Sequence, residues 1–91
     1  MTKQEQNQLS GVNIPDRTAI AKVLAVTNTG KLLNDLPVLS IYLEVQDPEV
    51  VPFNVNVKRA VNRLLIPRVG DLCRICYPPG YPEELLIQEL L

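Results

Sequence analysis

The chain has no histidine and no tryptophan among its 91 residues, and only one phenylalanine and three tyrosines. Histidine is the side chain that ordinarily titrates near neutral pH, and it is the commonest metal ligand. We also find no nucleotide-binding loop, no nucleophile paired with a base and no convincing set of metal ligands. The sequence therefore predicts a protein that is not an enzyme and that carries no cofactor.

Long hydrophobic runs are also missing. No apolar stretch approaches the roughly 20 residues that span a bilayer, and the polar residues 1–8 lack the hydrophobic segment of a signal peptide. We therefore expect a cytoplasmic protein without a membrane span. We interpret residues 1–15 as a flexible leader and residues 16–91 as one small domain, because a chain of this length accommodates a single core.

What the chain does contain is a repeated strand pattern. Apolar side chains recur mostly at every second position over residues 19–26, 38–45 and 53–57, as in a sheet with one buried face. Turn residues at 47–49 join the second and third segments into a hairpin. Gly30 and Asn34-Asp35 indicate a loop between the first and second segments.

The periodicity changes after the third strand. Val57, Val61, Leu64 and Leu65 fall at helical spacing and predict a short helix that ends before Pro67. Residues 72–77 then read as a fourth strand, which a proline-rich corner at 78–82 follows.

The last segment, residues 83–91, has two interpretations. Pro82 at a first helical position, with Glu83 and Glu84 behind it, favours a helix. The run Leu85-Leu86-Ile87 and the shortness of the segment favour a buried strand, which we prefer.

Two motifs suggest chemistry at first sight. Cys73 and Cys76 form a C-x-x-C pattern, but a spacing of three in a strand points the two sulfurs to opposite faces, so we interpret them as two small apolar side chains. Acidic residues, Asp47 and Glu49 among them, show no paired spacing and read as turn and surface residues.

The charge distribution is uneven. Between residues 58 and 74, five basic residues accompany one acidic residue, a local net charge of +4. A solvated surface, a patch for an acidic protein and a patch for nucleic acid all fit this segment, although a pI of 5.3 disfavours nucleic acid. The candidate partner-binding residues are Lys58, Arg59, Arg63, Arg68 and Arg74, together with Tyr42 on the polar face of its strand.

The spacing of turn residues resembles a bacterial small β-domain of uncharacterised function. The shared features are Thr29-Gly30, Asn34 and Pro37, a hairpin, Gly70 and the corner Tyr77-Pro78-Pro79, over about residues 19–88. This resemblance implies a final strand after Pro82 and no catalytic residues. The chain departs from the pattern at Pro78 and Tyr81, where acidic residues are usual.

These observations predict an all-β fold, a five-stranded antiparallel small barrel that is OB-like or SH3-like, with one helix between the third and fourth strands. The competing arrangement is an open sheet packed by two helices. We expect a binding or adaptor module that acts through protein–protein contacts, with itself as a candidate partner in a homodimer. The alternative function is single-stranded nucleic-acid binding. The expected dimer surface is an exposed strand edge or the apolar C-terminus, namely Leu85, Leu86, Ile87, Leu90 and Leu91.

Overall fold

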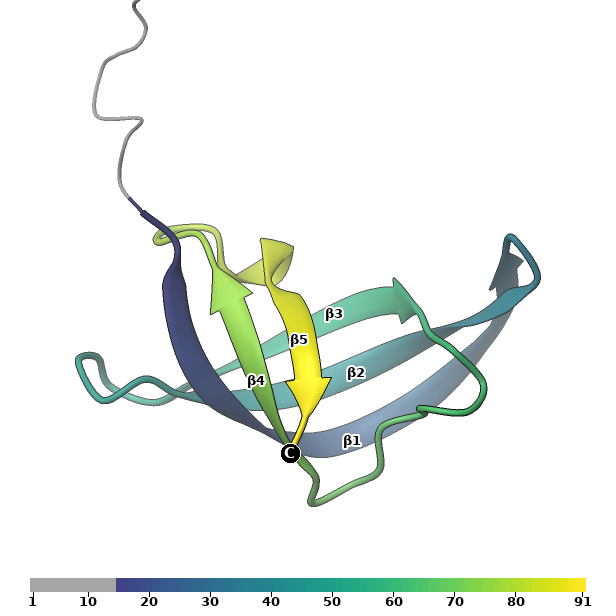
Figure 1. The fold of residues 1–91 in the computed structure, drawn as a ribbon, viewed down its shortest axis with the longest axis horizontal. Helices are drawn as coiled ribbons and strands as arrows, with labels where there is room; N and C mark the ends of the chain where they lie inside the picture. The colour runs from purple at the N-terminus through teal and green to yellow at the C-terminus, as the bar shows by residue number, and fades with distance from the viewer. Residues whose placement is uncertain (1–14) are drawn as a thin grey trace, which may run out of the picture.

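The structure is a computed structural model that describes residues 15–91. It contains five strands and one short 3₁₀ helix (Figure 1): β1 (Arg17–Leu33), β2 (Leu36–Gln46), β3 (Phe53–Ala60), β4 (Leu72–Tyr77), η1 (Pro82–Glu84) and β5 (Leu86–Leu90). The all-β class and the five antiparallel strands are therefore confirmed. Apart from Pro15, the predicted leader lies outside the described residues. No helix in the described range is long and apolar enough to cross a membrane.

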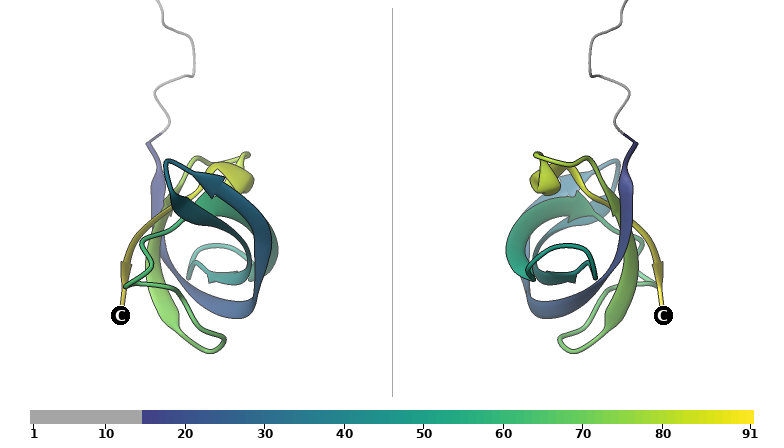
Figure 2. Two further views of the ribbon diagram at one scale, coloured as in Figure 1. Left: turned by 90° about the vertical axis from the view of Figure 1, so that its right-hand side faces the viewer. Right: turned by 90° about the vertical axis from the view of Figure 1, so that its left-hand side faces the viewer.

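The strands form one sheet in the order β3-β2-β1-β4-β5. The central strand β1 pairs with β2 along most of its length and with β4 through its first half. Figure 2 shows that the sheet is strongly curved, with one concave and one convex face. The sheet is not closed, because β3 and β5 remain its two edges among the described residues.

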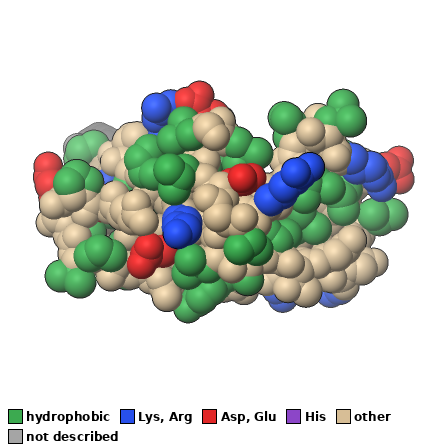
Figure 3. All heavy atoms as spheres, turned by 90° about the horizontal axis from the view of Figure 1, so that it is seen from below, with side chains coloured by type: hydrophobic (Ala, Val, Ile, Leu, Met, Phe, Trp, Pro, Cys, Tyr) green, Lys and Arg blue, Asp and Glu red, His purple; other side chains and the backbone are tan. Residues whose placement is uncertain are grey.

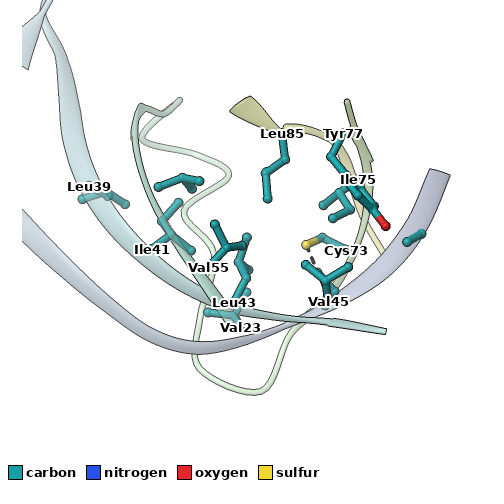
Figure 4. Packing of buried hydrophobic residues seen from close by; sticks show 13 residues of the cluster. Val23, Leu39, Ile41, Leu43, Val45, Val55, Cys73, Ile75, Tyr77 and Leu85 are labelled. Atoms are coloured by element: carbon teal, nitrogen blue, oxygen red, sulfur yellow. Dashed lines mark hydrogen bonds between the residues drawn. The ribbon is translucent and has the colours of Figure 1, made fainter. Parts of the chain in front are cut away.

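The core fills the concave side of this curled sheet (Figure 4). Alternate residues of each strand point inward, as the period-two pattern requires, and the ring of Phe53 lies edge-on to that of Tyr77 with centroids 5.8 Å apart. Thirteen apolar residues are buried: Ala19, Ala21, Val23, Leu39, Ile41, Leu43, Val45, Val55, Val57, Cys73, Ile75, Tyr77 and Leu85.

The loop predicted between the first two strands is much shorter than expected. β1 and β2 continue as a two-stranded arm, residues 28–39, that ends in the tight turn Asn34-Asp35. Both turn residues have positive φ, 52° and 65°, which is the conformation of a two-residue hairpin turn and suits Asn and Asp. Gly30, with φ 83°, lies inside the arm at an irregularity in the pairing.

The predicted helix after β3 is wrong. Residues 61–71, which we call the connection, hold only turns: the Asn62 side chain accepts the N–H of Leu64 (2.8 Å) and its carbonyl accepts the N–H of Leu65 (2.9 Å). Of the four apolar residues that suggested a helix face, Val57 belongs to β3 and the core, and Val61 packs partly against the core. Leu64 and Leu65 point into solvent instead, 89% and 65% exposed.

The final segment, residues 83–91, contains both the helical turn and the strand that its sequence suggests. Pro82, Glu83 and Glu84 form the single turn of η1, and the favoured strand follows as β5, paired with β4.

Candidate interaction surface

Large hydrophobic side chains are exposed together at one end of the molecule. They come from the tip of the arm and from the connection. Figure 3 shows hydrophobic side chains at this right-hand end with charged ones between them, and further hydrophobic side chains over the middle and the left-hand end. We call this surface the apolar end; it comprises Leu32, Leu33, Leu36, Leu64, Leu65 and Ile66.

Hydrogen bonds hold the connection against the arm. The N–H of Val61 donates to the carbonyl of Pro37 (3.0 Å), and Arg63 donates to the carbonyl of Asp35. A hollow of about 420 Å³ lies between the two segments, with Leu32 and Ile66 in its lining. These hydrogen bonds hold in place the backbone of the two segments that carry the exposed aliphatic side chains.

A second hollow lies on the other side of the connection, which we call the seam groove. Its volume is about 320 Å³, and it lies between the end of β3, the connection and β5. Aliphatic side chains line much of it, including Val61, Leu65, Ile87 and Leu90, while Arg59 and Glu89 are polar residues of the same lining. The groove marks the place where the curled sheet stays open.

The opposite end, which we call the locked end, is built differently. Asp47, only 3% exposed, accepts hydrogen bonds from Arg17 Nε (2.6 Å) and Nη2 (2.9 Å), from the Tyr77 hydroxyl (2.8 Å) and from the N–H of Glu49 (2.9 Å). These bonds join the start of β1, the β2–β3 turn and the end of β4. Asp47 is thus a buried structural residue, which corrects its interpretation as a surface residue.

The electrostatics of the locked end follow from this geometry. The hydrogen bonds from Arg17, and then the N–H of Glu49, hold the pKa of Asp47 well below its usual range. Burial, and then the hydrogen bond to Asp47, raise the pKa of the Tyr77 hydroxyl. Four donors already occupy this carboxylate, so it is a poor candidate for proton transfer. A hollow of about 430 Å³ opens beside it, lined by Arg17, Pro48 and their neighbours.

Three of the five predicted basic residues bind other parts of the chain. Arg59 donates to the carbonyls of Glu83 (3.3 Å) and Leu85 (2.6 Å), so it bridges β3 to the segment before β5. Arg63 donates to the arm, as described above, and Arg74 forms an ion pair with Glu89.

The remaining candidates lie on separate surfaces. Lys58 is exposed on β3 opposite Ser40, and Arg68 is exposed in the connection. Tyr42 is 40% exposed on β2, where its hydroxyl accepts a hydrogen bond from Asn54 (3.1 Å). The six predicted residues are thus spread over both faces of the sheet and over the connection.

The cysteines lie as expected, on opposite faces of β4. Cys73 is buried in the core, and Cys76 is half-buried beside Asp16; both are reduced thiols. Burial is the first cause that raises the pKa of each thiol, which lowers the thiolate population needed for redox or metal chemistry. Within residues 15–91, no three Cys, Asp or Glu side chains form a metal-binding group.

The fold is a small all-β sheet with a cluster of exposed aliphatic side chains at the apolar end. No protein-family model matches the chain, and neither a curated protein nor a solved structure matches it. The functional argument therefore rests on the geometry described above.

Proposed function

We propose that this protein is a non-enzymatic binding or adaptor module that acts through protein–protein contacts at the apolar end. The observation that carries this proposal is the concentration of six exposed aliphatic residues on two segments held together by hydrogen bonds. Soluble monomers rarely expose contiguous apolar patches of more than a few hundred Å², and larger ones usually mark interaction sites.

The predicted apolar C-terminus contributes less to this surface than the arm and the connection do. Leu85 is fully buried, and Ile87 and Leu90 pack against the core. Only Leu86 and Leu91 remain well exposed there. We therefore move the proposed contact from the C-terminus to the apolar end.

For the fold, we propose a partly open small barrel, OB-like in plan, with its seam between β3 and β5. The strand order supports this, since joining β3 to β5 would close the five strands into a ring. Arg59 supports it as well, because its two bonds to carbonyls before β5 draw the open edges together. An inward-pointing charge is one way that proteins protect an edge strand from further pairing.

The alternative function, binding of a single-stranded nucleic acid, has weaker support. Tyr42 and Lys58 share the outer face of the β2–β3 hairpin, but such sites generally combine several stacking aromatics with a continuous basic groove. A titration with a fluorescent oligonucleotide at low salt is expected to show no binding. Binding that weakens with rising salt would favour this alternative.

The proposal is tested by affinity capture with the immobilised wild-type chain and two immobilised variants. In one, Leu33→Asn and Leu64→Asn remove apolar surface from both segments of the apolar end. In the other, Val51→Asn changes a residue that is 84% exposed in the β2–β3 turn. We expect wild type and the Val51 variant to retain a protein that the apolar-end variant loses, a second copy of the chain included. Equal retention by all three would contradict the proposal.

A further inference from the structure

One segment forms the β4 side of the open seam, and we call it the strap. It comprises residues 82–91, which form η1, Leu85 and β5 after the proline-rich corner (Figure 1). Within residues 15–91, β5 pairs with β4 alone, and no strand pairing joins it to β3 across the seam. The strap is therefore fixed to the sheet by backbone pairing along one edge.

A single side chain anchors the strap in the core. Leu85 is fully buried, and Figure 4 shows it pointing into the cluster of buried residues. Elsewhere in the strap, Pro82, Ile87 and Leu90 are half-buried and the other residues are exposed. Segments with few buried apolar side chains open at a lower free energy than the rest of a fold. The strap therefore has the burial pattern of a segment that opens locally.

Arg59 of β3 holds the strap from the other side of the seam. Its guanidinium donates to the carbonyls of Glu83 (3.3 Å) and Leu85 (2.6 Å), which lie just before β5. The pairing of β5 with β4 comprises four residue pairs and is irregular after Arg74. The ion pair between Arg74 and Glu89 joins two well-exposed side chains, and such pairs contribute little to stability. Arg59 is therefore the side chain that holds the strap towards β3.

The corner before the strap provides a pivot. Pro78, Pro79 and Pro82 have restricted φ angles, whereas Gly80 has φ 88°, a conformation that favours glycine. Gly80 is exposed, and a Cβ atom built on it would meet nothing within 4 Å. Rotation at Gly80 would therefore move the strap without disturbing packed side chains at the pivot itself.

We propose that the strap opens as one unit about Gly80 and that Arg59 keeps it closed across the seam. β5 supplies one wall of the seam groove, so opening widens the groove, withdraws Leu85 from the core and exposes the edge of β4. The closed strap protects that edge from pairing with other strands. This inference goes beyond the proposed function, because it concerns access to the core and not the surface of the apolar end.

Native-state hydrogen exchange of the full chain at several low urea concentrations tests the opening. We expect the protected amides of the strap to share one protection factor, roughly tenfold or more below that of the central amides of β1 and β2. Their exchange should depend weakly on urea, because a local opening exposes little surface. Protection that falls residue by residue towards Leu91, as in fraying, would overturn the proposal. Protection and urea dependence equal to those of β1 and β2 would also overturn it.

Two matched pairs of variants test the parts assigned to Arg59 and Gly80. Arg59→Lys should raise exchange in the strap about tenfold, the effect of losing a hydrogen bond from a charged donor, and Arg68→Lys should not. Gly80→Ala strains the closed strap and should raise its exchange roughly fivefold or more, because rotation at the pivot relieves a left-handed alanine.

Gly30→Ala is the control for the pivot. Gly30 also has a positive φ, 83°, and open space around its Cβ position, but it lies in the arm, where its strain persists when the strap opens. Its substitution should therefore leave exchange in the strap unchanged. Wild-type exchange in the strap of Arg59→Lys or of Gly80→Ala would overturn the proposal, and none of these results bears on capture of a partner at the apolar end.

Discussion

The two ends of the molecule use their side chains in opposite ways. At the locked end, one buried carboxylate accepts four hydrogen bonds and joins three segments that are distant in the sequence. At the apolar end, one backbone hydrogen bond and one from the Arg63 side chain hold the connection against the arm, and the large side chains point away from the core. The polar side chains of the locked end therefore join segments of the fold, whereas the aliphatic side chains of the apolar end stay exposed.

This difference predicts that substitutions separate into two classes. Changes at the locked end should lower the free energy of unfolding without altering association. Changes at the apolar end should alter association and leave the free energy of unfolding of the monomer nearly unchanged.

The largest expected effect is the response of the locked end to acid. Because the folded pKa of Asp47 is lowered, its contribution is fully present above the unfolded pKa of about 3.9 and is lost as pH falls towards the folded value. Urea unfolding of wild type at pH 7, 4 and 3 should show a steep loss of stability. Asp47→Asn should be less stable at pH 7, with a shallower loss below pH 4. Parallel pH profiles for the two proteins would show that this carboxylate does not stabilise the fold.

Tyr77→Phe removes one of the four donors and keeps the ring. We expect the free energy of unfolding to fall by roughly 1.5–3 kcal/mol, the usual range for a hydrogen bond to a charged group. Urea unfolding at pH 7 measures it. Tyr42→Phe is the matched control, since it removes the hydroxyl of an exposed tyrosine that also has one hydrogen-bond partner, and it should cost less than about 0.5 kcal/mol. An equal fall in the free energy of unfolding for both variants would show that the Tyr77 hydroxyl stabilises the fold no more than an exposed hydroxyl does.

Arg59→Lys tests the seam between the two ends. Lysine keeps the charge but lacks the planar guanidinium that reaches the carbonyls of both Glu83 and Leu85. We therefore expect the free energy of unfolding to fall by about 1–2 kcal/mol. Amide hydrogen exchange should also rise in β5. Arg68→Lys is the control, because the Arg68 side chain makes no hydrogen bond within residues 15–91 and should show neither effect. Unchanged exchange in β5 would show that Arg59 does not hold the seam together.

The smallest effect on folding is expected at the apolar end. Leu64→Asn should change the free energy of unfolding of the dilute monomer by no more than about 0.5 kcal/mol. The control is Leu85→Ala in the core, which should cost about 2–5 kcal/mol. A loss for Leu64→Asn in the range of the core variant would mean that Leu64 packs inside the fold.

Much of the sheet could be predicted because its signal is local. Alternation along β2 and β3 identified both strands and their hairpin, since each inward residue is apolar and most outward residues are polar. The helix was mispredicted because periodicity counts apolar residues without knowing which way they point. Leu64 and Leu65 fit a buried stripe in sequence and are exposed in the structure.

The locked end could not be predicted from local patterns. Arg17, Asp47 and Tyr77 lie 30 residues apart from one to the next, and only the pairing of β1 with β2 and β4 brings them together. The arm was read as a loop because Gly30 and Asn34-Asp35 are both turn signals, of which only the second marks a reversal of the chain. The candidate basic residues were grouped by sequence, whereas three of them bind other parts of the chain.

The most direct test of the account is a dilution series of ¹H–¹⁵N spectra of the wild-type chain. We predict that amide signals of residues 32–36, 61–67 and 86–90 shift or broaden as concentration rises. Those of residues 47–49 and 77–79 should stay fixed over the same series. Concentration-dependent changes centred on the locked end would contradict the claim that the apolar end is the contact surface. No change at all would show that the chain is not its own partner.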